Sequence, residues 1–534
     1  MVFDIPLFSA ERTPDAEALS SGDTSCTYSE LADTLERFAG GLMACGLSRQ
    51  DRVAYYADKS IEGVAVLFGT CRAGGVMVPV NPLLKAEQVG YILRNCNVTV
   101  LVTTAHRLAA LDPILSSCPD LRQVVLLGPA RPDQPAASAA QIPAQHFGAF
   151  TSAGVMGGRH RVIDTDMAAI LYTSGSTGNP KGVVLSHRNI VAGAQSVASY
   201  LGNCATDRIL AALPLSFDYG LSQLTTAFLA GATAVLHNYL LPADAVRALA
   251  RQRITGLAAV PPLWLQLTSV SWPDAASGHL RYFTNSGGAL PTATLATLRQ
   301  RMPKARPYLM YGLTEAFRST YLPPEEIDRR PTSMGKAIPN AEILVVRADG
   351  SPCADDEPGE LVHRGALVAL GYWNDPARTA ERFRPLPRRD AGVVLPEIAV
   401  WSGDTVRRDQ EGFLYFVGRR DEMIKSSGYR ISPTEVEEAV YRTGLVAEAA
   451  AIGVEHPVLG QAIVLVARPH PEKTPDTDAL LSACRELLPG FMMPTCVDWL
   501  AHGLPRNANG KIDRPLLARE RARRFGSTDP KSAQ

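Results

Sequence analysis

A loop rich in glycine and hydroxyl side chains, set between two apolar runs, is the feature that most constrains this chain. It lies in the segment Leu171-Tyr-Thr-Ser-Gly-Ser-Thr-Gly-Asn-Pro-Lys-Gly-Val-Val-Leu-Ser-His187, and residues 167–172 before it are predicted to form a short strand. Three glycines in the segment allow the backbone to bend and to approach a ligand closely. Free backbone N–H groups, hydroxyl donors and the charge of Lys181 together favour a polyphosphate ligand.

The loop departs from the common P-loop, in which Gly and four further residues precede Gly-Lys-Ser/Thr. Pro180 stands where that pattern requires its second glycine, and Gly182 follows Lys181. A flexible linker is the alternative, but linkers rarely lie between apolar strands. Ser186 is placed to cap a helix that His187 begins.

Length and charge narrow the class of protein. A chain of 534 residues is too long for one hydrophobic core, so we expect two or more domains. Lys plus Arg and Asp plus Glu both number 53, so bulk charge gives no support for a nucleic-acid partner.

Cysteine usage and apolar runs indicate where the chain resides. Nine cysteines without a C-x-x-C pair favour free thiols in a reducing compartment. The first residues carry no basic, apolar leader pattern, and no stretch of about 18 apolar residues suggests a membrane span. The sequence therefore predicts a cytoplasmic protein.

Strand and helix patterns alternate along most of the chain. Strands are predicted at residues 53–56, 76–80 and 98–102 with helices between them, which indicates α/β architecture with largely parallel sheets. Before the first of these strands, Ser29 is expected to cap a helix that ends at Gly46. Residues 129–160 are rich in Pro, Ala, Ser and Gly and suggest a surface connection.

Four further motifs carry polar groups suited to chemistry. They are Ser286-Gly-Gly288, Tyr311-Gly-Leu-Thr-Glu315, Ser402-Gly-Asp404 and Leu504-Pro-Arg-Asn-Ala-Asn-Gly-Lys-Ile-Asp-Arg514. Each alone has a structural alternative. The 311–315 segment also suits a glycine turn followed by a helix start, and a lysine on the 509–510 turn is usually solvated surface.

Together with the long segment Gly418-Arg-Arg-Asp-Glu-Met-Ile-Lys-Ser-Ser-Gly-Tyr-Arg-Ile-Ser-Pro433, the motifs resemble the adenylate-forming superfamily. That superfamily contains acyl-CoA synthetases, luciferases and the adenylation domains of peptide synthetases. The resemblance implies an α/β fold: a large N-terminal domain of packed α/β subdomains over residues 1–420 and a small mobile α+β domain over residues 421–534. Asp421 falls at the implied hinge.

The resemblance also implies how a nucleotide binds. Tyr311 would stack on adenine, Asp404 would accept both ribose hydroxyls, and Glu315 would hold Mg²⁺. Arg430 matches a phosphate contact made when the small domain is closed. The nucleotide-binding residues implied as a set are Thr173, Ser174, Gly175, Ser176, Thr177, Gly178, Lys181, Ser286, Gly287, Gly288, Tyr311, Gly312, Thr314, Asp404, Arg419 and Arg430.

The implied reaction has two halves. A carboxylate attacks ATP to give an acyl-adenylate and pyrophosphate, and a thiol of CoA or of a carrier-protein phosphopantetheine then displaces AMP. Lys511 would bridge the carboxylate and the α-phosphate, and Thr314, Glu315 and Lys181 would complete the catalytic set. The small domain would rotate between halves and bring the Gly428 region to the thiol.

The sequence does not identify the acid substrate. Phe217-Asp218 has the form that amino-acid-activating members use to bind the substrate ammonium, and Gly288 would also line the acid. One candidate is therefore an amino acid, such as a proline-like one, and a simple carboxylic acid is equally compatible if Asp218 only caps a helix near Tyr219. The amino-acid sequence as a whole also resembles ligases encoded with bacterial exosortase systems. A regulatory protein that kept the fold is a further alternative, although no charged motif residue has been lost.

Overall fold

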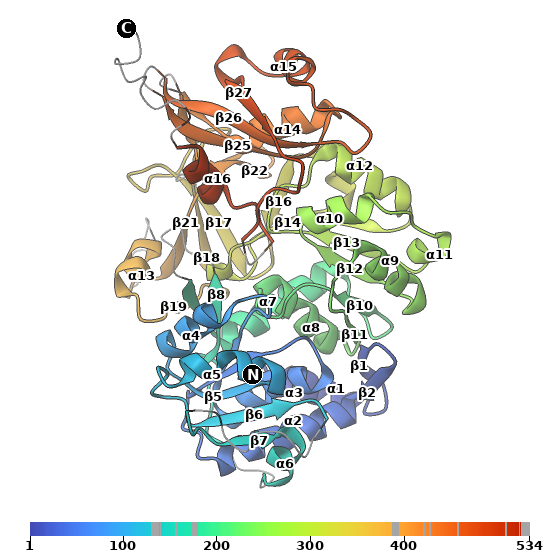
Figure 1. The fold of residues 1–534 in the computed structure, drawn as a ribbon, viewed down its shortest axis with the longest axis vertical. Helices are drawn as coiled ribbons and strands as arrows, with labels where there is room; N and C mark the ends of the chain where they lie inside the picture. Colours follow the sequence, from blue (N-terminus) through green and yellow to red (C-terminus); the bar gives the residue numbers. More distant parts are fainter. Residues whose placement is uncertain are drawn as a thin grey trace.

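A computed structural model describes residues 1–129, 138, 140–154, 159–173, 180–386, 395–419, 422–426, 429–456, 459–507, 510–522 and 524. Two large mixed sheets and one small sheet, with helices packed around them, form the described part of the chain (Figure 1). The predicted α/β class with a large N-terminal and a small C-terminal domain is confirmed.

The first large sheet has 14 strands and changes character along its width. Neighbouring strands from β1 to β14 are parallel apart from the β1–β2 hairpin, whereas the strands beyond β14 pair antiparallel. The expectation of largely parallel sheets is therefore wrong for this second half. In spatial order the strands are β17 (Ala341–Val346), β18 (Gly359–Gly365), β21 (Ile398–Arg408), β22 (Leu414–Arg419), β16 (Ser333–Ala337), β15 (Thr320–Leu322), β14 (Arg306–Tyr311), β13 (Tyr282–Asn285), β12 (Gly256–Ala259), β10 (Arg208–Ala211), β11 (Thr233–Leu236), β1 (Glu17–Ser21) and β2 (Thr24–Thr27), with β20 (Phe383–Pro385) beside β21.

The second large sheet has eight strands and carries the two strands that flank the glycine-rich loop. Strands β8 and β9 pair antiparallel, and β9 in turn pairs with the short β19, while the other neighbours are parallel. In spatial order they are β19 (Gly371–Tyr372), β9 (Lys181–Ser186), β8 (Met167–Thr173), β4 (Val76–Pro79), β3 (Arg52–Tyr56), β5 (Val98–Thr104), β6 (Gln123–Leu127) and β7 (Ala144–His146).

The helices of the large domain connect and cover these sheets. None of the helices in the described ranges has the length and apolar character needed to cross a bilayer. They are α1 (Asp4–Arg12), α2 (Tyr28–Ala44), α3 (Ile61–Ala73), α4 (Ala86–Asn95), α5 (Ala105–Leu115), α6 (Phe147–Ser152), α7 (His187–Leu201), α8 (Asp218–Ala230), α9 (Pro242–Arg251), α10 (Pro261–Thr268), α11 (Asp274–Ser277), α12 (Thr292–Arg301) and α13 (Pro376–Arg382), with 3₁₀ turns η1 (Thr314–Ala316) and η2 (Pro324–Glu326).

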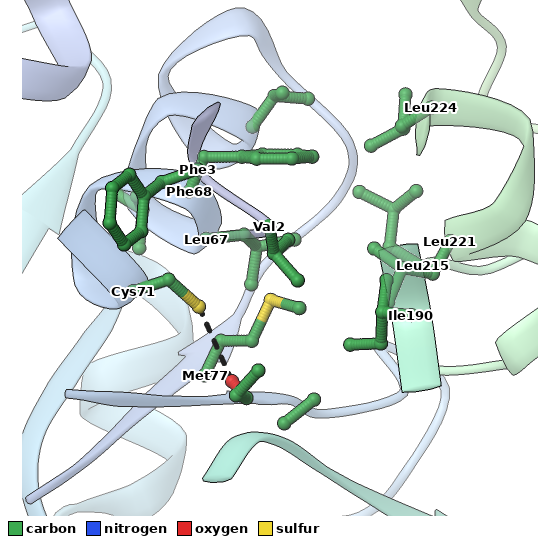
Figure 2. Close-up of a cluster of buried hydrophobic side chains, with 14 of the residues drawn as sticks. Val2, Phe3, Leu67, Phe68, Cys71, Met77, Ile190, Leu215, Leu221 and Leu224 are labelled. Carbon is green, nitrogen blue, oxygen red and sulfur yellow. Dashed lines mark hydrogen bonds between the residues drawn. The ribbon is translucent and has the colours of Figure 1, made fainter. Parts of the chain in front are cut away.

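The main core lies where helices of the two large sheets meet. Figure 2 shows Leu67 and Phe68 of α3 facing Ile190 of α7 and the apolar side of α8, all of them buried. The Sγ of Cys71 donates a hydrogen bond to the backbone carbonyl of Ala168 at 3.3 Å across the same region. Because side chains from α3, α7 and α8 share one core, the start of α8, where Asp218 lies, is held firmly against the rest of the domain.

The small sheet has its own core and lies at the C-terminal end of the molecule (Figure 1). Its helix α14 packs on β25. The elements are β24 (Tyr429–Ile431), β23 (Ile424–Ser426), β26 (Gly460–Pro469), β25 (Val446–His456) and β27 (Cys496–Trp499), with α14 (Pro433–Arg442), α15 (Thr477–Arg485), the 3₁₀ turn η3 (Gly490–Met492) and α16 (Arg514–Arg521).

Two local predictions need correction. Thr27, not Ser29, caps α2, because its side chain accepts from the backbone N–H of Glu30 while the Glu30 carboxylate accepts from the N–H of Thr27. The predicted surface connection contains β7 and α6, and α6 buries Phe150 against α2. A side chain at Gly41 would clash with Phe150, so the missing Cβ permits this contact.

Candidate active site

The site lies where the parallel strands of the first large sheet end. Asn285 ends β13 and precedes the Ser286–Gly288 segment, and Tyr311 ends β14. Ligand sites in parallel sheets form at the carboxyl ends of the strands, because loops from neighbouring strands converge there. Strand β10 of the same sheet likewise leads through residues 212–217 to Asp218 at the start of α8.

Strands β8 and β9 of the second sheet bring Thr173 and Lys181, on either side of the glycine-rich loop, to this region. Thr173 pairs with Lys181 at the end of the hairpin where the two strands are connected, and the loop residues Ser174, Gly175, Ser176, Thr177 and Gly178 lie outside the described residues. The Thr173 Oγ1 is buried and has no hydrogen-bond partner among the described atoms. An unsatisfied buried hydroxyl next to the loop is compatible with a ligand oxygen.

Lys181 joins the loop to the 311–315 motif. Its Nζ lies 3.2 Å from the Glu315 Oε1 and 3.0 Å from the Tyr372 hydroxyl, which donates to the same Oε1 at 2.6 Å. Burial by itself would raise the pKa of Glu315, but the charge of Lys181 and the Tyr372 hydroxyl outweigh it and lower the pKa. Glu315 is therefore an ionised carboxylate beside Lys181, the first residue of β9.

A second carboxylate lies at the other end of the motif. The Tyr311 hydroxyl donates to the Asp404 Oδ2 at 2.5 Å, and the Arg419 Nε lies 3.4 Å from the Asp404 Oδ1. Asp404 and Arg419 are paired residues of β21 and β22, so the sheet register brings them together. Burial raises the pKa of Asp404, whereas Arg419 and the Tyr311 hydroxyl act to lower it.

Lys511 reaches this region from the small domain. It follows Gly510, whose φ is +76°, in a turn closed by the Asn507 N–H donating to the Lys511 carbonyl at 2.8 Å. The residue is exposed to solvent, yet protein around its amine and the charge of Arg419 lower its pKa, against the opposing effect of Asp218 and Asp404.

The glycine segment lies next to this lysine. Gly287 has φ +81°, and a Cβ there would lie 3.7 Å from the Phe217 ring and 3.8 Å from the Lys511 Cε. The Asn285 side-chain amide donates to the Gly288 carbonyl at 3.0 Å and fixes the turn. Residues from three distant parts of the sequence therefore meet around Gly287.

Asp218 is the first residue of α8 and is buried. Its side chain makes no capping hydrogen bond, so the alternative of a helix cap is not what the structure shows. Instead the Thr314 hydroxyl donates to its Oδ1 at 3.2 Å, and the Arg318 Nη1 lies 3.4 Å from its Oδ2. Burial raises the pKa of Asp218, while Arg318 and Lys511 act to lower it.

Comparison with known proteins places the chain in a family. The family model described as AMP-binding enzyme matches residues 8–373, and the model of the AMP-binding enzyme C-terminal domain matches residues 435–511. The chain belongs to the AMP-binding enzyme family. The assignment to the adenylate-forming superfamily made from the sequence motifs is thus confirmed.

Relatives of this AMP-binding enzyme differ in size. It is 30% identical to the indoleacetate–CoA ligase of Aromatoleum aromaticum over 95% of this chain and 96% of that protein. It is 31% identical to a linear gramicidin synthase of Brevibacillus parabrevis over 95% of this chain but 6% of that synthase. The chain spans only 6% to 9% of the length of this and two further Brevibacillus parabrevis synthases.

Solved structures have the same fold. ATP-bound MatB from Rhodopseudomonas palustris matches with a TM-score of 0.85 at 25% identity, over 98% of this chain and 100% of that one. MenE from Bacillus subtilis, in complex with the acyl-adenylate intermediate OSB-AMP, matches with a TM-score of 0.80 at 26% identity, over 96% of this chain and 97% of that one.

Two residues of the site were not predicted from the sequence, and the roles predicted for three other residues stay predictions. Tyr372 and Arg318 carry no motif; the only signal for Arg318 is a charged residue inside the otherwise uncharged segment 316–323. Asp421 and Gly428 lie outside the described residues. Arg430 lies opposite Lys425 in the β23–β24 pair, and its phosphate contact stays a prediction.

His187 of the AMP-binding enzyme is structural, as its predicted place at a helix start indicated. It is buried at the first position of α7, and its Nδ1 accepts a hydrogen bond from the backbone N–H of Val2 at 3.2 Å. Burial lowers the pKa of His187 from 6.5 to about 4. The His187 side chain therefore binds a proton near pH 6.5 in the unfolded chain but only near pH 4 in the folded chain. The free energy of unfolding decreases as the pH falls from 6.5 toward 4.

We expect this effect to be measurable by urea unfolding at pH 7 and pH 5. Protonation of His187 should lower the free energy of unfolding by about 2 kcal/mol between pH 7 and pH 5, because one pKa unit corresponds to about 1.4 kcal/mol. The variant His187→Gln should lose correspondingly less stability over the same interval. Equal losses in the wild type and the variant would show that His187 does not titrate in this way.

Proposed function

We propose that this chain is an AMP-forming acid–thiol ligase. A carboxylate oxygen attacks the α-phosphorus of ATP and pyrophosphate leaves; a thiol then attacks the acyl carbonyl and AMP leaves. The observation that carries the proposal is the convergence of Lys511 with Asp404, Asp218 and the Gly287 turn. A cation between a nucleotide-binding carboxylate and an acid-binding region is placed to offset charge on the attacking and phosphoryl oxygens.

The nucleotide would lie along the ends of the parallel strands. Asp404 accepts the ribose hydroxyls, Tyr311 contacts the adenine, and Arg419 supports Asp404. The phosphates lie against the 173–178 loop and Lys181, and Thr314 contacts the α-phosphate. Two contacts support this arrangement. Tyr311–Asp404 joins the 311–315 motif to the 402–404 motif, and Lys181–Glu315 joins the 311–315 motif to the residue at the start of β9.

Glu315 fits a magnesium ion held largely by phosphate oxygens and water. Mg²⁺ usually binds through one or two carboxylates plus substrate phosphates. In the described part of the chain no cluster of three or more His, Cys, Asp and Glu residues could hold a metal alone. Glu315 is ionised and lies beside Lys181, so it would hold the ion, which would neutralise charge on the phosphates.

A substitution at Asp404 tests the ribose contact. Asp404→Asn should raise the KM for ATP by about 10- to 100-fold, because hydrogen bonds to charged groups contribute about 1.5–3 kcal/mol. The wild type should also bind 2′-deoxy-ATP or 3′-deoxy-ATP more weakly than ATP, and the variant should discriminate much less. A variant that still discriminates as strongly as the wild type would rule out the ribose role.

The division into a large domain of residues 1–420 and a mobile domain of residues 421–534, with a hinge at Asp421, is part of the proposal. Its support is that separate family models match 8–373 and 435–511. In this structure the Thr292 hydroxyl of α12 donates to the Glu438 Oε1 of α14 at 2.6 Å. Lys511 is in the site at the same time, so this contact belongs to the adenylating arrangement.

Breaking that contact should affect one half-reaction. Glu438→Ala should slow adenylate formation by about fivefold, because one hydrogen bond contributes about 1 kcal/mol, and should not slow thioester formation. Glu486→Ala, an exposed glutamate of the same domain, is the control and should change neither rate. Equal slowing of both half-reactions by Glu438→Ala would argue against a rotating domain.

Two classes of acid are supported by different observations. The match to the indoleacetate–CoA ligase over nearly its whole length supports a simple carboxylic acid and CoA as acceptor. The match to the gramicidin synthase and the Phe217-Asp218 pair support an amino acid and a carrier-protein phosphopantetheine. Either thiol supports the same second step.

The proposal is tested by acid-dependent exchange of labelled pyrophosphate into ATP without any thiol. A panel of simple, aryl and amino acids identifies the acid, and adding CoA or a phosphopantetheinylated carrier then identifies the acceptor. We expect exchange with at least one acid and AMP release on adding a thiol. Absence of exchange over the whole panel, or ADP as the product, would contradict the proposal.

A further inference from the structure

The contact between Asp218 and Arg318 bears on which acid the site accepts. Both side chains are almost completely buried, with 3% and 2% of their surface exposed, and they come from different elements. Asp218 starts α8, whereas Arg318 follows η1 and leads into β15. The ion pair is therefore built by the tertiary fold and not by a local turn.

Arg318 has no second anion to balance it within the described residues. Its Nη1 contacts Asp218, its Cζ lies 4.6 Å from the centroid of the Tyr219 ring, and its Nε and Nη2 are buried without hydrogen-bond partners. A buried guanidinium surrounded by aromatic rings depends strongly on its one carboxylate. Asp218 is thus neutralised from inside the protein.

Asp218 is also close to the reacting groups. Its Oδ1 accepts from Thr314, and its charge acts on the amine of Lys511. An α-ammonium group on the acid would lie beside the reacting carboxylate and would bring another cation to Asp218. One carboxylate does not balance two buried cations, so the ammonium would be left partly uncompensated.

We propose that Arg318 is a specificity-determining residue, which neutralises Asp218 and so favours acids without an ammonium group next to the carboxylate. The inference rests on the proposed function and decides between its two classes of acid. Arg318 acts through Asp218 and takes no part in the chemistry. Removing it frees Asp218 to accept an ammonium group.

Two stable mimics of the acyl-adenylate test the inference without any turnover. Propanoyl-sulfamoyladenosine and alanyl-sulfamoyladenosine differ only in the α-ammonium group, and their tails are small. By calorimetry the wild type should bind the propanoyl compound at least tenfold more tightly. Arg318→Met should shift the ratio of the two Kd values toward the alanyl compound by at least tenfold.

Two further variants show whether the shift comes from charge. Arg318→Lys keeps the cation and should keep the wild-type preference. In Asp218→Asn/Arg318→Met the carboxylate is also gone, and the gain for the alanyl compound should disappear. A shift that persists in this double variant would overturn the inference, because it would not depend on Asp218.

The ratio of the two Kd values for the wild type tests the inference even if Arg318→Met fails to fold. Equal or tighter binding of the alanyl compound by the wild type would overturn the role of Arg318 and leave the proposed function standing. Failure of the wild type to bind either mimic would instead contradict the proposed function, because both compounds mimic an acyl-adenylate. Preference for the propanoyl compound, lost in Arg318→Met, supports the inference.

Discussion

Lys511→Ala is expected to abolish adenylate formation and to leave thioester formation from a supplied acyl-adenylate largely intact. The amine of Lys511 is held near Asp218 and Asp404 by a turn of the small domain. Losing a charge contact that strengthens in the transition state costs about 3 kcal/mol or more, which is at least a hundredfold in rate. Both half-reactions are followed separately, by pyrophosphate exchange and by AMP release.

The matched control is Lys473→Ala, an exposed lysine in another turn of the same domain. It should leave both half-reactions at wild-type rates. Equal loss of both half-reactions in Lys511→Ala would contradict the assigned role, since it would indicate damage to the domain or to nucleotide binding. Retained pyrophosphate exchange would also contradict it.

Asp218→Ala is expected to destabilise the large domain by about 3–5 kcal/mol, because removing one partner of a buried ion pair leaves an uncompensated charge. The charge left behind is that of Arg318, whose side chain is 2% exposed. Urea unfolding followed by tryptophan fluorescence measures the loss. The double variant Asp218→Ala/Arg318→Met should recover most of it, since the stranded cation is removed as well.

The two single variants and the double variant form a thermodynamic cycle. A coupling of more than about 1 kcal/mol is expected for residues in direct contact. Additive losses would show that the pair is not coupled and would weaken the charge argument for the acid. The same cycle explains why Asp218→Ala alone is a poor test of ammonium binding, because it changes stability and charge together.

Much of the fold follows from local patterns in the sequence. Apolar runs at 53–56, 76–80 and 98–102 became β3, β4 and β5, because short continuous apolar runs suit strands of a parallel sheet that are buried on both faces. The helix start at His187 was also predictable, since Ser186 accepts from the backbone N–H of Asn189 and the Asn189 side chain accepts in return. Thr27 displaced Ser29 as a cap because both residue types suit the role and tertiary packing chooses the helix start.

The candidate site was only partly predictable. Motif residues such as Tyr311, Asp404 and Lys511 could be singled out because their resemblance to a family extends over the chain. The partners Tyr372 and Arg318 could not, because their roles arise from pairing between distant elements. Tyr372 meets Lys181 only because β19 pairs with β9, and Arg318 meets Asp218 only because η1 lies against α8.

The most direct test of the central claim is to follow oxygen from the acid. The acid that supports the fastest pyrophosphate exchange is labelled with ¹⁸O in its carboxylate and turned over with ATP and the thiol. The account predicts one ¹⁸O atom in the phosphate of AMP, because the attacking oxygen stays on phosphorus when the thiol displaces AMP. Label in inorganic phosphate with ADP as the product, or AMP without label, would contradict it.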